Sequence, residues 1–155
     1  MIGALHRLAY RMAHALRHRW RRWRKVPLAG VSMIARDVEG RLLLVRLSYA
    51  DAGWSFPGGG ANRGESMEAA AIRELAEETG CGAETVRLVG TLDETLSGSP
   101  HTAHVFTCLT QDLPRPDGRE VVEARFFPPH SLPHPMTART QERLALWRAS
   151  ERIYA

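Results

Sequence analysis

The segment 59–81, GGANRGESMEAAAIRELAEETGC, constrains this chain more than any other part of its sequence. Three of its glutamates, Glu74, Glu77 and Glu78, lie at positions i, i+3 and i+4. On a helix these carboxylates lie on one face, where like charges repel one another. A divalent cation between them turns this repulsion into binding, because hard cations prefer carboxylate oxygens. With glycines just before the helix, the spacing predicts a magnesium site that faces phosphate.

The whole segment resembles the Nudix box, Gx5Ex7REUxEExGU, where U is a bulky aliphatic residue. The last position holds Cys81, which packs as a small hydrophobe. The matching positions are Gly59, Glu65, Arg73, Glu74, Leu75, Glu77, Glu78 and Gly80. The chain is therefore similar to the Nudix hydrolase family, and the surrounding strand pattern extends the resemblance over about residues 28–150.

The resemblance implies an α/β fold, an α/β/α sandwich built on a mixed sheet, for a domain spanning residues 27–155. Hydrophobic periodicity independently predicts the elements of such a fold. Ser66 is the expected N-cap of the box helix and Gly80 its end. Its expected packing surface is Ala69, Ala70, Ile72, Leu75, Ala76 and Thr79. The expected strands are 28–35, 41–48, 54–57, 84–94, 102–110 and 121–127, and the expected helices are 67–79 and 137–150.

By position in the box, the resemblance assigns Glu77 and Glu78 as metal ligands and Glu74 as a ligand or as the base that deprotonates water. The carbonyl of Gly58 is the expected backbone ligand. The cofactor implied is Mg²⁺ or Mn²⁺. Without the resemblance, the same three carboxylates could form an ordinary solvated helix face.

Further residues are expected to support or extend this site. Gly59, Glu65 and Arg73 have a structural role by resemblance, since an arginine can pin a carboxylate through two hydrogen bonds. Glu120 is the expected additional ligand or base, with Glu123 as the alternative. The candidate substrate-binding residues are Arg41, Arg46, Trp54 and Phe56. The two arginines could instead be solvated side chains on a strand, and the two aromatic residues could instead pack in the core.

The charge of the chain is unevenly distributed. Of 21 Lys and Arg residues, nine lie within residues 1–36, where no acidic residue occurs. The remainder carries 12 basic and 17 acidic residues. The basic character therefore belongs to the N-terminal region. The rest of the chain is acidic, and an acidic domain that binds an anionic substrate needs a metal ion between protein and substrate. The two cysteines, Cys81 and Cys108, show no metal spacing and are expected to be buried thiols.

Residues 1–26 are predicted to form a basic arm with an amphipathic helix over about 4–25. Its apolar stripe could dock on the domain or on a second copy of the chain, which would give a homodimer. Alternatively, the helix could lie on a membrane surface, contact RNA through its arginines, or serve as a cleaved targeting peptide. No apolar run is long enough to span a membrane, and a cytoplasmic location, or a peripheral one at a membrane, is expected.

The resemblance implies a metal-dependent hydrolase that cleaves the diphosphate linkage of a nucleoside diphosphate joined to another group, by attack of water on phosphorus. Two alternatives remain open from sequence. One is a nucleotide sensor that binds without cleavage, and the other is an RNA 5′-end pyrophosphohydrolase that uses the basic arm.

Overall fold

The computed structural model of the protein describes residues 28–48 and 53–154. Residues 1–26, with the amphipathic helix expected over 4–25, lie outside the described residues. Within them, none of the helices has the length and apolarity needed to cross a membrane.

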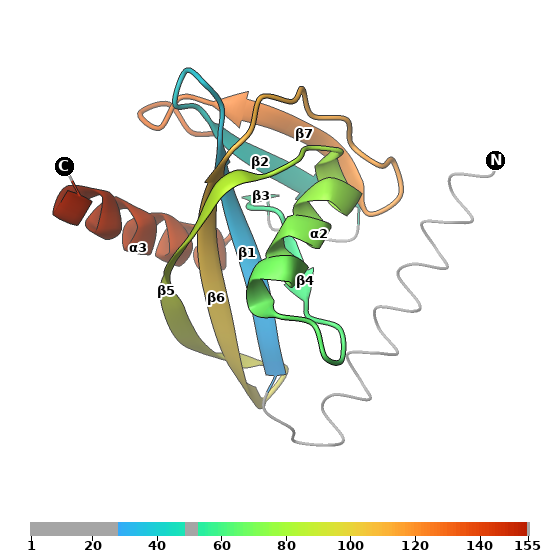
Figure 1. Cartoon of the computed structure of the whole chain (residues 1–155). Helices are drawn as coiled ribbons and strands as arrows, with labels where there is room; N and C mark the ends of the chain where they lie inside the picture. The colour runs from blue at the N-terminus through green and yellow to red at the C-terminus, as the bar shows by residue number, and fades with distance from the viewer. Residues whose placement is uncertain (1–27, 49–52, 155) are drawn as a thin grey trace.

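A mixed β-sheet forms the centre of the domain (Figure 1). Strands β1 and β6 run parallel to one another in the middle, and the order along the main path is β3-β2-β1-β6-β5. Two strands lie off this path, with β4 pairing with β1 and β7 with β2. The bounds are β1 Leu28–Arg36, β2 Leu42–Leu47, β3 Trp54–Ser55, β4 Gly58–Gly60, β5 Glu84–Leu96, β6 Ser99–Leu109 and β7 Val121–Phe127.

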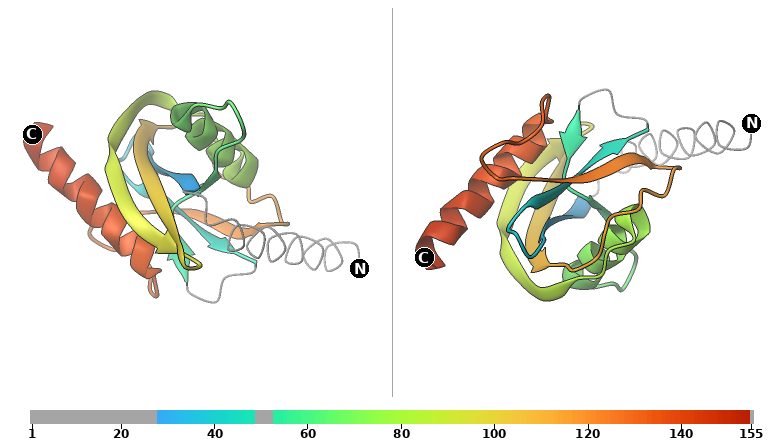
Figure 2. Two further views of the ribbon diagram at one scale, coloured as in Figure 1. Left: turned by 90° about the horizontal axis from the view of Figure 1, so that it is seen from below. Right: turned by 90° about the horizontal axis from the view of Figure 1, so that it is seen from above.

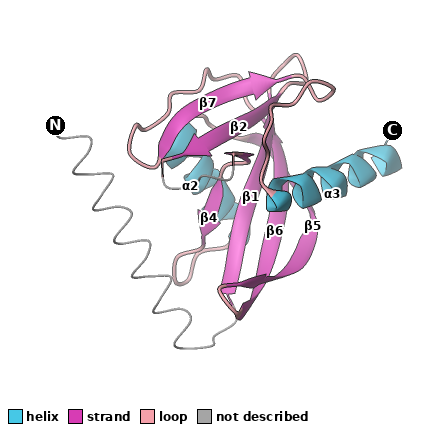
Figure 3. Ribbon diagram, turned by 180° about the vertical axis from the view of Figure 1, so that it is seen from behind, coloured by secondary structure: helices cyan, strands magenta, loops and turns pink. Residues whose placement is uncertain are grey.

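The two helices, α2 (Met67–Thr79) and α3 (Ala138–Tyr154), cover opposite faces of the sheet (Figure 2). The side chains of β1 alternate between the faces, so Met33 packs toward α2 and Ile34 toward α3. Each helix closes its own apolar core, through Leu75 on the α2 side and Trp147 on the α3 side. Figure 3 shows α3 lying across the strands on the face behind α2. The predicted α/β/α sandwich is thus confirmed.

Helix α2 begins and ends where its sequence predicts. The Ser66 hydroxyl accepts a hydrogen bond of 3.1 Å from the Ala69 backbone N–H, and Gly80 closes the helix in the left-handed conformation with φ of 71°. The packing face was only partly predicted, because Ala69 and Ala76 are exposed while Ala71 is buried. The helix also turns the carboxylate-bearing Glu78 inward.

The expected strand 54–57 is divided in the structure. Trp54–Ser55 pairs with β2, and Gly58–Gly60 forms the separate strand β4 against β1. The β5–β6 hairpin turns at Ser97 and Gly98, both with positive φ, so that β6 starts three residues earlier than expected. Cys81 and Cys108 are buried free thiols, as predicted.

Candidate active site

Arg73 contacts several of the acidic side chains of the candidate site. Its guanidinium makes two hydrogen bonds to Glu65, of 2.8 and 3.0 Å, and one of 3.0 Å to the Gly60 carbonyl. It also pairs with Glu74 at 2.9 Å and Glu77 at 3.2 Å. Glu65 in turn accepts a 2.8 Å hydrogen bond from the Asn62 backbone. One arginine therefore ties the glycine strand, the following loop and α2 together.

Glu78 is the most deeply buried acid near α2, with 2% of its surface exposed. Its carboxylate accepts a hydrogen bond from the Gly58 backbone N–H, but Oε2 has no partner among residues 28–48 and 53–154. Burial raises the pKa of Glu78 well above its usual value, and the neighbouring charges of Glu120, Glu74 and Asp117 raise it further. A buried carboxylate without a cation is costly, so this position favours a positively charged ligand.

Glu74 lies between this buried acid and Arg73. Burial raises the pKa of Glu74, against the lowering effect of Arg73, and the charges of Glu77 and Glu120 add to the rise. Gly59 in β4 lies directly over this carboxylate, because a Cβ at Gly59 would stand 2.5 Å from Glu74 Oε1. The box glycine therefore leaves room for an acidic side chain rather than forming a turn.

The loop between β6 and β7 supplies Glu120. Ser48 donates a 2.7 Å hydrogen bond through its backbone N–H to the Glu120 carbonyl, next to the start of β7. Asp117 holds the loop by accepting hydrogen bonds from three successive backbone N–H groups, those of residues 119, 120 and 121. Asp117 was not identified from sequence, although DG within a polar loop is a recognisable turn signal.

The alternative candidate Glu123 lies within β7 and pairs with two arginines, Arg46 at 3.6 Å and Arg125 at 3.4 Å. Glu120, by contrast, is close enough to raise the pKa of both Glu74 and Glu78. The structure therefore brings Glu120, and not Glu123, to the carboxylates of α2.

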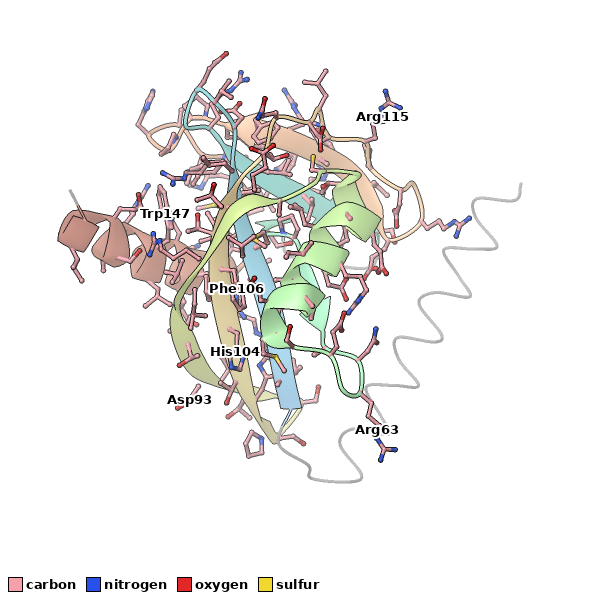
Figure 4. All side chains as sticks on the ribbon, viewed as in Figure 1. Arg63, Asp93, His104, Phe106, Arg115 and Trp147 are labelled. Atoms are coloured by element: carbon pink, nitrogen blue, oxygen red, sulfur yellow. The ribbon has the colours of Figure 1, made fainter. Side chains whose placement is uncertain are left out.

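The four side chains expected to contact substrate instead contact other residues of the protein. Arg41 bonds Asp37 at 2.7 Å across the β1–β2 turn, and Arg46 stacks over the Trp54 ring at 5.7 Å. Trp54 and Phe56 are 7% and 6% exposed and pack in the core beneath α3. Figure 4 shows Arg63 and Arg115 near the two ends of α2, extending away from it, and both are exposed.

The donor chemistry of the site fits a hard divalent cation, since it offers carboxylates, a backbone carbonyl at Gly58 and one unpartnered buried oxygen. Among residues 28–48 and 53–154, however, no three acidic, histidine or cysteine side chains are already gathered closely enough to hold an ion. Arg73 instead pairs with both Glu74 and Glu77.

Comparisons with known proteins place the chain in a family. The NUDIX domain model matches residues 26–147. An RNA pyrophosphohydrolase of Sphingopyxis alaskensis is 49% identical over 55 residues, which are 35% of this chain and 34% of that relative. Among solved structures, a MutT NUDIX hydrolase from Burkholderia pseudomallei superimposes with a TM-score of 0.70 and 27% identity, covering 78% of this chain and 98% of that one. The structure of a UDP-X diphosphatase superimposes with a TM-score of 0.70 and 28% identity, and the match covers 84% of this chain and 65% of the diphosphatase chain.

The match to the family model covers most of the chain, and it includes the box, the glycine strand, α2 and the part of α3 up to Trp147. The curated relative is matched over only about a third of its own length. From the box residues, the sandwich fold and the family match together, this chain belongs to the Nudix hydrolase family.

Proposed function

We propose that this protein is a metal-dependent hydrolase that cleaves the diphosphate linkage of a nucleoside diphosphate joined to another group. The observation that carries the proposal is the excess of acid at the site. Glu74 and Glu77 share one guanidinium, Arg73, while the charges of Glu120 and Glu74 raise the pKa of the buried Glu78. Such an excess destabilises the folded protein unless cations neutralise it, which supports a site built to bind Mg²⁺ or Mn²⁺.

In this proposal Glu77, Glu78, Glu74 and the Gly58 carbonyl hold the ion. A bound divalent ion supplies positive charge that stabilises the negative charge developing on the phosphoryl oxygens. Glu120 or Glu74 accepts the proton of the attacking water, and burial together with neighbouring acids raises the pKa of Glu74. Arg73 restrains Glu74 and Glu77 before the ion arrives. The products are two phosphorylated fragments of the substrate.

The experiment compares wild-type protein with Glu77→Gln and Glu78→Gln, assayed with Mg²⁺ or Mn²⁺ on a panel of nucleoside diphosphate derivatives and nucleoside triphosphates. Glu142→Gln is the matched control, because Glu142 is an exposed acid on α3. Turnover is expected in the wild type and control and is expected to be lost in both box variants. Full activity of a folded Glu77→Gln or Glu78→Gln protein would show that these roles are wrong.

A second candidate activity is removal of pyrophosphate from RNA 5′ ends. It is favoured by the name of the bacterial relative, an RNA pyrophosphohydrolase, whose matched segment is short. The test is cleavage of 5′-triphosphorylated RNA by the full chain and by a chain lacking residues 1–25. If the basic arm holds RNA, its deletion should weaken RNA binding and the salt dependence of binding should become shallower. Equal activity of both chains on RNA would rule out that role for the arm.

Binding without cleavage is the remaining alternative. It is disfavoured because the box retains every acidic and glycine position of its pattern. A nucleotide that binds tightly in the presence of Mg²⁺ and is recovered intact after prolonged incubation would favour the sensor over the hydrolase.

A further inference from the structure

A second charged cluster lies on the face of β1 that is turned away from α2. Its centre is Arg143 of α3, a side chain with 7% of its surface exposed. Arg143 forms an ion pair of 2.7 Å with Glu94 of β5, and its Nε donates a 2.8 Å hydrogen bond to the hydroxyl of Ser32 in β1. A third contact, of 3.0 Å, goes to the carbonyl of Arg139 one turn earlier in α3. One guanidinium thus connects α3, β5 and β1.

The surroundings keep this ion pair charged. Burial alone would raise the pKa of Glu94, but the contact with Arg143 and the charge of Arg139 lower it below its usual value. His101 contacts the same carboxylate at 3.2 Å, and burial lowers the pKa of His101 despite that contact. The cluster consequently has two arginines around one carboxylate, with a histidine that favours its neutral form.

Docking of α3 does not require this ion pair. The same helix already packs Leu144 and Trp147 into an apolar core with Ile34 and Val105. Buried ion pairs add little stability compared with apolar residues of similar size, because desolvation cancels most of the attraction. The contact that apolar residues could not replace is the directed hydrogen bond to Ser32.

Ser32 is placed directly behind the proposed metal site. It is the register partner of Gly58 in the β1–β4 pair, and the next residue, Met33, donates a 2.8 Å hydrogen bond to the Pro57 carbonyl. The two strands approach so closely that a Cβ at Gly58 would collide with the Val31 carbonyl oxygen. A shift of β1 at Ser32 is therefore transmitted to Gly58.

Gly58 in turn contacts the site on the other face, where its N–H donates to Glu78 and its carbonyl is the expected backbone ligand. The carboxylates of Glu74, Glu78 and Glu120 repel one another there. The strand that carries Gly58 is only three residues long, and among the described strands it pairs with β1. It requires a firm support on its far side.

We propose that Arg143 is a positioning residue for the metal site. It holds β1 at Ser32, and β1 holds Gly58 against Glu78, so that a contact on the α3 face fixes a ligand pair on the α2 face. The inference rests on the proposed function, because it assumes that Glu78 and Gly58 bind the ion.

The test uses the full chain with Arg143→Lys, Ser32→Ala and the double variant. Lysine keeps the positive charge beside Glu94 but has a single ammonium group, which cannot reproduce the guanidinium's simultaneous contacts with Glu94 and Ser32. Ser32→Ala removes the same hydrogen bond from the other side with a smaller change in volume. Arg148→Lys is the matched control, because Arg148 lies on the same helix, is exposed and donates to the Pro129 carbonyl.

The readouts are the dissociation constant for Mn²⁺, measured by electron paramagnetic resonance without substrate, and the Mg²⁺ concentration that gives half-maximal activity. Both are expected to rise about tenfold in Arg143→Lys and in Ser32→Ala, as is typical when a residue that orients a metal ligand is changed. The double variant should be no worse than Arg143→Lys, because both changes break one link. The control Arg148→Lys should bind Mn²⁺ as the wild type does. In Arg143→Lys and Ser32→Ala, kcat at saturating metal should change little.

The outcomes separate this inference from the proposed function. If wild-type protein binds Mn²⁺ and Glu78→Gln does not, while folded Arg143→Lys and Ser32→Ala bind it normally, the positioning role is wrong and the metal site stands. Lower thermal stability with unchanged Mn²⁺ affinity would also overturn the positioning role, since it indicates helix docking alone. If the wild type binds no Mn²⁺ and hydrolyses no substrate, the proposed function fails and this inference falls with it.

Discussion

The backbone N–H of Gly58 donates a hydrogen bond to the carboxylate of Glu78, and this contact joins the three-residue strand β4 to the last turn of α2. This contact leaves Oε2 of Glu78 without a partner among the described residues. A buried group that is half satisfied is tolerated where function needs it, because the cost is recovered when a ligand binds.

Replacing Glu78 with glutamine should therefore increase the stability of the metal-free protein and abolish its activity. In metal-free buffer at pH 7.5, Glu78→Gln should be more stable than the wild type, because burial and the neighbouring acids disfavour a charged carboxylate and the amide carries no charge. Turnover should be lost. Chemical unfolding and a phosphate-release assay measure the two effects, and lower stability of the variant would show that Glu78 is already compensated within the protein.

The response to metal should depend on pH. The pKa values of Glu74 and Glu78 are raised above the usual 4.5, so both groups favour the folded, metal-free protein most below about pH 4.5. That contribution is lost as the pH rises through their folded values. Protons and Mg²⁺ then compete for the same oxygens, and the rise in melting temperature on adding Mg²⁺ should be larger at pH 8 than at pH 5.

Thermal melts of wild type and Glu78→Gln at both pH values, with and without Mg²⁺, test this expectation. The variant corrects for other groups whose pKa is lowered, such as Glu65 through its contact with Arg73. A wild-type shift that is equal at the two pH values would contradict metal binding by these carboxylates.

Gly59→Ala should reduce activity far more than stability. The added Cβ would stand 2.5 to 2.9 Å from the Glu74 carboxylate, which is the movable end of a flexible side chain. Glu74 would turn away while the backbone stays in place, and kcat should fall at least about tenfold because a ligand or base is displaced. Gly82→Ala is the control, because Gly82 is exposed and its nearest neighbour would be 3.3 Å away.

Arg73→Lys should weaken both the loop and the site. The guanidinium bonds Glu65 twice and the Gly60 carbonyl once, and a lysine ammonium cannot span these positions. We expect a loss of about 1–2 kcal/mol in the free energy of unfolding, as for removal of charged hydrogen bonds. Hydrogen exchange should increase at residues 61–66, and unchanged exchange there would show that the loop is held by other contacts.

The local features of this fold could be predicted from sequence. Ser66, Gly80 and the i, i+3, i+4 glutamates act within one helix, so their spacing alone determines the cap, the end and the acidic face. The same holds for the β-hairpin strands, whose alternation of residues is a local pattern.

The features that failed or were missed depend on contacts between distant residues. Trp54 and Phe56 offered either stacking or packing, and only the position of α3 shows that they are covered. Arg143 and Ser32 are 111 residues apart, so nothing in the sequence relates them. The buried side of α2 was also misjudged at Ala71, because the neighbouring strands and not the helix alone determine which alanines are covered.

The three glycines of β4 make one wall of the active site a part of the β-sheet itself. That wall can open only by breaking the ladder with β1, which would disturb the core beneath it. Residues 111–120, which carry Glu120 on the opposite wall, lie outside any helix or strand. Exchange of ligands during turnover should therefore depend on movement of this loop, and changes of substrate preference among related chains should accumulate there without disturbing the rigid wall.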